Sequence, residues 1–217
     1  MKYLLFVNFF LACFVFTTIT SCSHKTYKKV SVGPSYTYTI QSDFFKTDSV
    51  HYFKTSIDTY GKALSGILAI KKLNADTLKV SFFTELGVSF FDVLIMHDSY
   101  NLVRCIPQLD TKGVMNTIVE DIRWVVLFNL NQLSQPVWVK KEGMEPTVRL
   151  NYQDVYIFSQ LSPDNLPLQI TYVYGSKFKS KFEVKYAQFE NSIPTKIFVS
   201  HFNIDLKIDL TAITFSN

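Results

Sequence analysis

A strict alternation of apolar and charged side chains over residues 177–186 constrains the fold of this chain more than any other feature. The even positions carry Phe178, Ser180, Phe182, Val184 and Tyr186, and the odd positions carry Lys177, Lys179, Lys181, Glu183 and Lys185. Successive side chains of a β-strand point to opposite faces of a sheet, so this pattern predicts an antiparallel strand with one face in water. Further along, Ile204, Leu206, Ile208 and Leu210 alternate with Asp205, Lys207 and Asp209 in the same way.

The same period of two recurs through most of the chain after residue 50. Weaker alternation marks 78–82 and 168–174. Further strands are predicted at 50–59, 63–72, 88–96, 99–105, 136–141, 146–150, 153–159 and 194–201, with turn residues between them. Short strands at hairpin spacing form a meander, which curls or closes to protect its edges. The expected fold class is therefore mainly β (α+β), a curled antiparallel sheet or incomplete β-barrel.

One segment, from about Thr111 to Phe128, has a helical period instead. Val114, Ile118, Ile122 and Val125 recur at helical spacing with Met115, Val119 and Val126 beside them, while Lys112, Asn116, Glu120 and Arg123 face away. Asp110 or Thr111 can cap this helix. A single amphipathic helix in a strand meander must cover an apolar face of the sheet, either as fixed core or as a movable lid. Glu120 and Asp121 are interpreted as a solvated pair on its polar side.

The first 21 residues predict export from the cytoplasm. Met1-Lys2 gives a positive start, and Tyr3 to Phe16 is an apolar run that is too short for a transmembrane helix. Ile19-Thr20-Ser21-Cys22 then resembles the bacterial lipobox, in which small residues precede a cysteine that receives a diacylglycerol. Cys22 is therefore predicted to be the lipid-bearing first residue of the mature protein. The alternative is an ordinary secretory signal with an incidental cysteine at this position.

This N-terminus also suggests a domain organisation and a location. Residues 22–36 are polar and without period, which is typical of a flexible tether, and residues 37–217 form a single β-rich domain. Ser23 follows the cysteine, where an aspartate would suggest inner-membrane retention in some bacteria. We therefore expect a lipid-anchored protein of the cell envelope, and we favour the outer membrane, facing the periplasm, over the inner membrane.

The sequence lacks the motifs of enzymes, of metal sites and of nucleic-acid-binding proteins. His24, His51, His97 and His201 are isolated from one another and from Cys105, and no H-E-x-x-H, C-x-x-C, G-x-S-x-G or P-loop pattern occurs. The 22 Lys and Arg against 18 Asp and Glu form no basic block. Cys105 is interpreted as core, and Asp92 as a strand carboxylate that faces water or caps a turn. We expect no catalytic residue, no metal, no cofactor and no nucleic-acid partner.

Two stretches resemble the LolA/LolB-like lipoprotein-localisation family. In the first, Ser65-Gly66-Ile67-Leu68-Ala69-Ile70-Lys71-Lys72 leads through consecutive hairpins to Leu86–Asp92, as in LolB-like chains. In the second, Ile193-Pro194-Thr195-Lys196-Ile197 precedes a final alternating hairpin within Tyr186–Leu210. The hairpin order covers most of residues 50–210. The resemblance implies an incomplete antiparallel barrel with an apolar concave face, partly covered by helix, that binds acyl chains and catalyses nothing.

These expectations combine into a non-enzymatic, membrane-anchored envelope lipoprotein that binds an acyl chain or another apolar ligand, with lipoprotein or lipid trafficking as a role compatible with that binding. The residues expected to line the ligand are Phe82, Phe90, Tyr172, Phe182, Val184, Tyr186, Leu206 and Ile208. The alternative is a structural or adaptor lipoprotein, whose sheet is filled by its own side chains and whose surface binds an envelope protein. An open apolar groove of about 300–1,000 Å³ distinguishes the first from the second.

The lipobox prediction can be tested by replacing Cys22 with serine. The variant should remain an uncleaved or unanchored precursor, because stable peripheral anchoring needs more than one acyl chain, each buried CH₂ contributing about 0.8 kcal/mol. Metabolic labelling of cells with a clickable palmitate analogue should mark the natural chain and leave the Cys22→Ser chain unlabelled. Equal labelling of both chains, or of neither, would contradict the prediction.

Overall fold

The computed structural model describes residues 28–29, 49–126, 137–140, 147–152, 155–161, 167–174, 179–190 and 193–213. The predicted signal peptide, Cys22 and all of the predicted tether except residues 28 and 29 lie outside these residues. The strands are β1 (Lys28–Lys29), β2 (Val50–Thr59), β3 (Lys62–Asn74), β4 (Thr77–Phe83), β5 (Ser89–Met96), β6 (Tyr100–Cys105), β7 (Val137–Lys140), β8 (Thr147–Tyr152), β9 (Val155–Leu161), β10 (Pro167–Tyr174), β11 (Lys179–Glu190), β12 (Ile193–His201) and β13 (Leu206–Ala212), and the helix is α2 (Lys112–Val125).

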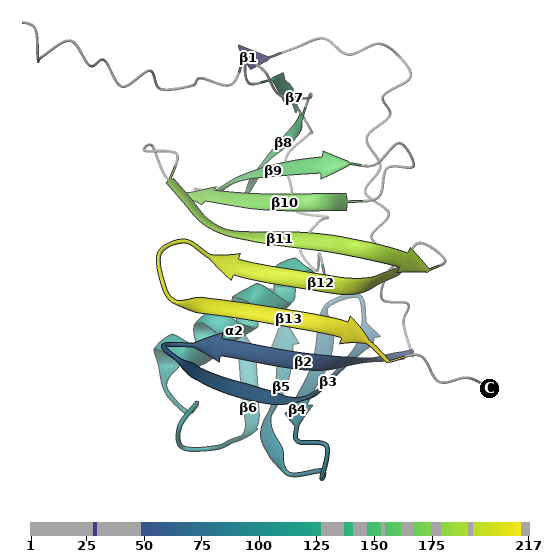
Figure 1. The fold of residues 1–217 in the computed structure, drawn as a ribbon, viewed down its shortest axis with the longest axis vertical. Coiled ribbons are helices and arrows are strands. Elements are labelled where there is room, and N and C mark those ends of the chain that lie inside the picture. Colours follow the sequence, from purple (N-terminus) through teal and green to yellow (C-terminus); the bar gives the residue numbers. More distant parts are fainter. Residues whose placement is uncertain are drawn as a thin grey trace, which may run out of the picture.

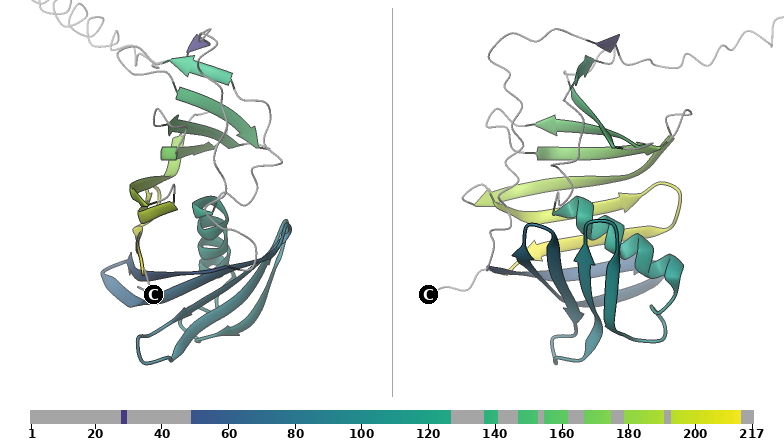
Figure 2. Two further views of the ribbon diagram at one scale, coloured as in Figure 1. Left: turned by 90° about the vertical axis from the view of Figure 1, so that its right-hand side faces the viewer. Right: turned by 180° about the vertical axis from the view of Figure 1, so that it is seen from behind.

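The described strands form one antiparallel sheet that does not close on itself (Figure 1). Its order is β1-β7-β8-β9-β10-β11-β12-β13-β2-β3-β4-β5-β6. Two meanders, β2–β6 and β7–β13, are joined side by side because the last strand, β13, pairs with β2. The sheet curls so that β3–β6 wrap around one side of α2, with β11–β13 on the other (Figure 2). The predicted fold class, a curled antiparallel sheet with one helix over it, is confirmed.

The strands follow the predicted alternation closely. In β13, Leu206, Ile208 and Leu210 are buried on the concave face, and the polar residues between them are exposed. The largest difference is at the end of β11, which continues to Glu190. The two-residue strand β1 was not predicted, because it lies within the proposed tether; there it pairs antiparallel with β7.

Gly66, in the stretch Ser65–Lys72 that resembles LolB-like chains, has a structural role in β3. It lies on the concave side of β3, and a Cβ atom at this position would collide with the backbone carbonyl of Phe83 and press on the ring of Phe82. Glycine therefore lets β3 and β4 approach closely at this position.

Helix α2 lies in the concave face and begins at the predicted cap. The Thr111 side chain accepts a hydrogen bond from the Val114 amide. Ile118, Ile122 and Val125 are buried against the sheet as predicted. The prediction for Val114 was wrong, since 39 % of it is exposed. The first turn of α2 lies at the rim of the sheet, and in it Met115 is buried while Gly113 and Val114 are exposed. In the last two turns, by contrast, nearly every side chain is buried. No helix in the described part of the chain is long and apolar enough to cross a membrane.

This packing predicts a contrast between two truncations of similar side chains on one helix. Ile118→Ala should lower the free energy of unfolding by about 2–5 kcal/mol, because it leaves a cavity between α2 and the sheet. Val114→Ala, on the exposed rim, should change it by about 0.5 kcal/mol or less. Urea unfolding followed by tryptophan fluorescence measures both. Equal losses in the two variants would mean that the helix face is wrongly assigned.

Candidate functional site

The residues predicted to line a ligand all lie in one apolar cluster on the concave face. Seven of them are buried, namely Phe82, Tyr172, Phe182, Val184, Tyr186, Leu206 and Ile208. Phe90 is half-buried and packs against the same cluster, its ring stacked on Phe82 with centroids 4.8 Å apart. The eight residues selected from the sequence thus come from five strands, and the fold brings their side chains together.

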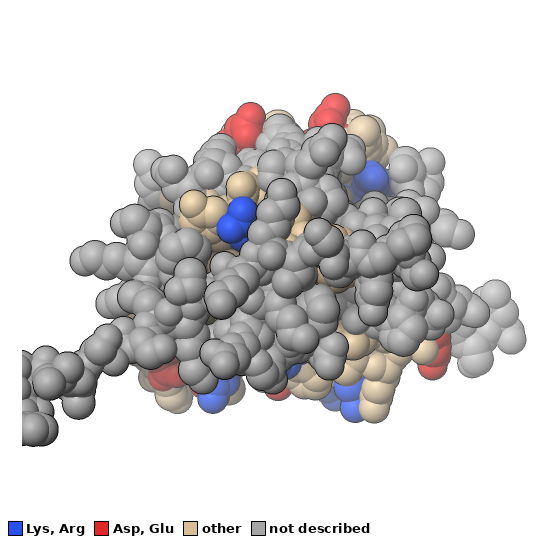
Figure 3. All heavy atoms as spheres, turned by 90° about the horizontal axis from the view of Figure 1, so that it is seen from above, with Lys and Arg blue, Asp and Glu red and all other residues tan. Residues whose placement is uncertain are grey.

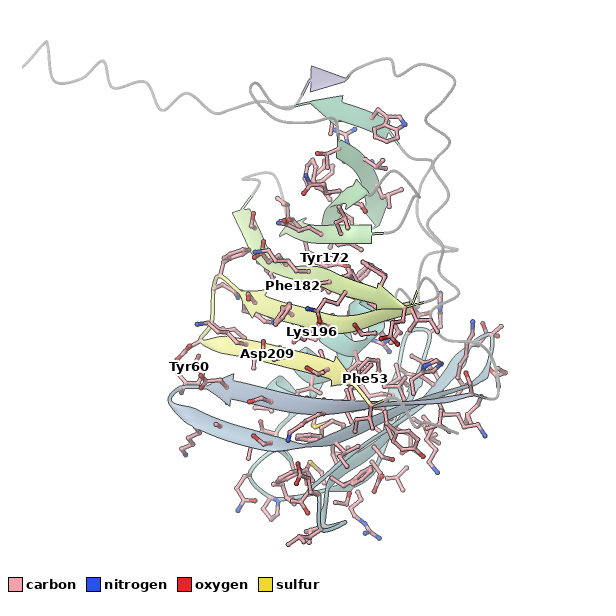
Figure 4. All side chains as sticks on the ribbon, turned by 45° about the vertical axis from the view of Figure 1, so that its right-hand side comes forward. Phe53, Tyr60, Tyr172, Phe182, Lys196 and Asp209 are labelled. Atoms are coloured by element: carbon pink, nitrogen blue, oxygen red, sulfur yellow. The ribbon has the colours of Figure 1, made fainter. Side chains whose placement is uncertain are left out.

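A column of aromatic rings connects α2 to β10, β11 and β12. Tyr172 stacks on Phe182 with centroids 4.3 Å apart, and Trp124 of α2 lies tilted against Tyr172 at 4.8 Å. On its other side, Phe182 stacks on His201 at 5.1 Å. Figure 4 shows Tyr172 and Phe182 on the neighbouring strands β10 and β11. These lining residues are therefore packed on one another and on the helix.

The hydroxyl of Tyr186 holds the C-terminal end of α2. It donates to the backbone carbonyls of Trp124 and Val125, at 3.2 and 3.0 Å. These carbonyls belong to the last turn, whose oxygens have no partner within the helix. Burial raises the pKa of Tyr186, so the hydroxyl keeps its proton and remains a donor.

Under the middle of α2 the interface is nearly full. A cavity of about 20 Å³ lies between the helix and strands β2, β3, β5, β12 and β13. That volume holds about one water molecule. Its lining is apolar except for two buried polar side chains, Thr55 and Asp121.

Asp121 and His201 form a buried hydrogen-bonded pair of ionisable side chains between α2 and β12. The His201 Nε2 lies 2.9 and 3.0 Å from the two carboxylate oxygens, and the side chains are 6 % and 2 % exposed for His201 and Asp121. Burial raises the pKa of Asp121, an effect that the hydrogen bond and charge of His201 only partly oppose. The interpretation of Asp121 as a solvated partner of Glu120 was therefore wrong. A signal was available, because His201 follows Ile197 and Val199 on the inward side of β12.

Arg123 ties α2 to the turn between β5 and β6. Its guanidinium contacts the Glu120 carboxylate and donates to the backbone carbonyls of Met96 and Ser99, both at 2.7 Å. The prediction that Arg123 faces water was wrong, since only 5 % of the residue is exposed. A long side chain can start from the polar side of a helix and still reach a neighbouring turn, where carbonyl oxygens replace its water.

A groove of about 770 Å³ runs between one side of α2 and β6. It is lined by Asp98, Ser99, Tyr100, Asn101, Leu102, Asp110, Thr111, Met115, Asn116, Val119, Glu120 and Arg123. Tyr100 reaches across it and donates from its hydroxyl to the Asn116 side-chain oxygen at 2.9 Å. The sequence analysis did not identify this groove, because its residues come from the ends of separate elements and share no period.

The remaining singled-out residues have local partners. The sulfur of Cys105, which is half-buried, lies 3.9 Å from that of Met115, and burial together with Asp110 raises the pKa of the thiol. Asp92 accepts a hydrogen bond from the Ser89 hydroxyl at 3.0 Å. Within the described ranges, no group of three or more His, Cys, Asp or Glu side chains is placed to hold a metal. Basic and acidic side chains of the described residues are interspersed on the face drawn in Figure 3.

Comparison with solved structures identifies the fold. The chain is similar to a LolA superfamily protein from Nitrosomonas europaea (10 % identity, TM-score 0.50) and to a DUF1329 family protein from Desulfovibrio piger (14 % identity, TM-score 0.54); each match covers 80 % of this chain and 88 % of the other. A putative outer membrane lipoprotein-sorting protein domain from Vibrio parahaemolyticus matches at 9 % identity and TM-score 0.48, over 77 % and 84 %. No protein-family model and no curated protein matches the sequence. At these identities the likeness is one of fold, and the chain has a LolA-like fold.

The raised pKa of Asp121 predicts a pH-dependent difference in stability between the protein and its Asp121→Asn variant. The folded state binds the Asp121 proton more tightly than the unfolded state, whose carboxyl titrates near 3.8. The stability contribution of this group therefore falls as pH rises above that value, and asparagine has no such dependence. Between about pH 4 and about pH 6, above the pKa of an ordinary aspartate, the difference should shift in favour of Asp121→Asn. Urea unfolding at several pH values measures it.

The matched control is Asp209→Asn, which neutralises an exposed carboxylate on the outer side of β13. Its unfolding free energy should follow that of the natural chain at every pH. If the free energy of unfolding of Asp121→Asn instead falls relative to that of the natural chain as pH rises, then His201, and not burial, dominates the titration of Asp121.

Proposed function

We propose that the protein is a membrane-anchored lipoprotein of the cell envelope that binds an acyl chain or another apolar ligand on its concave sheet face, with α2 as the lid. The lipobox-like sequence at Cys22 supports the anchor, and the LolA-like fold supports an apolar concave face. The ligand would lie where α2 now packs, against side chains of β2, β3, β12 and β13.

The observation that carries this proposal is the presence of buried ionisable side chains in an otherwise apolar helix–sheet interface. Asp121 of α2 pairs with His201 of β12, and the Arg123 guanidinium donates hydrogen bonds to two backbone carbonyls of the β5–β6 turn. Apolar side chains at such buried positions often give an equally stable or more stable interface, because burying charges carries a desolvation penalty. When the helix leaves, these polar side chains regain water, and this lowers the free-energy cost of opening. Buried polar groups of this kind suit a helix that docks and undocks.

Opening α2 would uncover a continuous apolar surface. The side chains beneath it are Ile57, Leu68, Ile70, Val199, Ile208 and Leu210. They belong to neighbouring strands of the sheet and face the same side. In the closed arrangement the helix side chains Ile118, Ile122 and Val125 occupy this surface in place of a ligand.

A second candidate is an adaptor lipoprotein that binds an envelope protein and keeps its core filled. It is favoured by the mutual stacking of Trp124, Tyr172 and Phe182 and by the small cavity under the helix. The two candidates differ in whether α2 must move for function.

Locking α2 to the sheet distinguishes them. Met115→Cys places a second thiol on α2 beside Cys105, whose sulfur lies 3.9 Å from the Met115 sulfur. In the chain from residue 22 onward with Cys22→Ser, joining the two thiols with dibromobimane should reduce binding of a dansylated undecanoic acid at least about tenfold, since the lid must open for an apolar ligand to enter. Dansyl fluorescence on titration measures binding.

The control is the same variant treated with monobromobimane, which alkylates both thiols without joining them and should leave probe binding within about twofold of the untreated protein. Binding that persists in the locked protein would exclude a lid. A protein that never binds the probe, locked or unlocked, would leave the adaptor as the better candidate.

A further inference from the structure

We infer that the groove between α2 and β6 is a docking site for an extended segment of a partner protein that carries basic side chains and adds to the sheet as a strand beside β6. This site lies at the sheet edge and does not depend on an apolar ligand beneath α2. It gives the adaptor candidate a surface and a partner chemistry.

The first argument is the free edge of β6. It is the terminal strand of the sheet, and no strand in the described part of the chain pairs with its outer side. The Met96 amide donates to the Ser99 carbonyl across the turn, and antiparallel pairs alternate between bonded and non-bonded positions. Tyr100 opposite Ile95 and Leu102 opposite Val93 are therefore non-bonded pairs. Their backbone N–H and C=O groups point away from β5, to the free side of β6, where an added strand can use them.

The second argument is the shape and lining of the groove beside that edge. Its volume is about 770 Å³, and both Tyr100 and Leu102 line it. The buried side chains of Met115 and Val119, on α2, provide an apolar floor. A strand laid along β6 would place alternate side chains over this floor, while its backbone pairs with the edge.

The third argument is charge. Asp98 and Asp110 are exposed at the two ends of β6 and both line the groove. The charge of Glu120 is already paired with Arg123, so Asp98 and Asp110 give the lining a net negative charge. A segment with a basic residue near each end and small or apolar residues between them fits this arrangement.

The same charges argue against a second copy of this chain as the occupant. Two β6 strands that paired antiparallel would bring Asp98 of one copy close to Asp110 of the other at both ends of the contact. Like charges placed across a strand pair are destabilising. A basic partner avoids this repulsion.

The test uses the full chain in detergent micelles and two fluorescein-labelled peptides, acetyl-Lys-Thr-Val-Thr-Val-Lys-amide and the same peptide with glutamate in place of both lysines. The lysine peptide should bind and slow amide hydrogen exchange in the segment 99–105. The glutamate peptide should bind at least about tenfold more weakly. Fluorescence anisotropy measures binding, and mass spectrometry after deuterium exchange locates it.

Matched variants separate the groove from charge in general. The double variant Asp98→Asn, Asp110→Asn should bind the lysine peptide about tenfold more weakly than the natural chain. The control double variant Asp58→Asn, Asp209→Asn changes two carboxylates exposed on the outer face (Asp209 is labelled in Figure 4) and should bind the peptide as tightly as the natural chain. Circular dichroism should show that both double variants fold like the natural chain.

Three results would overturn the inference. They are equal binding of the two peptides, peptide binding without protection of 99–105, and protection of 99–105 that grows with protein concentration when no peptide is present. The last result would identify a second copy as the occupant. None of them depends on whether the lid-locked protein binds dansylated undecanoic acid.

Discussion

The pairing of β13 with β2 determines the position of every other element. It joins two meanders into one sheet and thereby places β6, at one end of that sheet, far from β7, the next strand in the chain, which lies at the other end with only β1 beyond it. The connection between them has to cross one face. Because α2 lies in this connection and carries apolar side chains on one side, it crosses the concave face, where it buries them. The topology therefore explains why the one helix in the described part of the chain lies inside the curl of the sheet.

Burial of that helix brings polar groups into the core, and each has a defined partner. Asp121 is paired with His201, Arg123 with two carbonyls of the β5–β6 turn, and the last turn of α2 with the Tyr186 hydroxyl. Each contact joins α2 to a different strand or turn, so together they fix the rotation of the helix as well as its depth. Apolar contacts alone would fix the rotation less sharply, because dispersion and burial have little directionality.

The sequence predicts the strands and the helix well because both depend on local periods. Alternation such as that of Phe182, Val184 and Tyr186 records which face of a strand is buried, whatever its neighbours are. The strand order, with β13 beside β2, depends on contacts between distant segments and leaves no local pattern. The errors on α2 have a related cause. A helical period assigns Val114 to the buried side and Arg123 to the exposed side, but burial there depends on the distance of each turn from the sheet rim.

The position of Arg123 links the two proposed sites. Its guanidinium is bound to the carbonyls of Met96 and Ser99, so movement of α2 away from the sheet would release the turn that begins β6. The groove is formed by α2 on one side and β6 on the other, and a partner strand lying in it would contact both. Such a partner binds the closed arrangement better than the open one and would oppose entry of a ligand beneath the helix. Coupling between two binding equilibria is reciprocal. A ligand that lifts α2 would therefore lower the affinity for the partner by the same factor by which the partner lowers the affinity for the ligand. A protein with this arrangement would hold its partner while its concave face is empty and release it when an apolar ligand binds there.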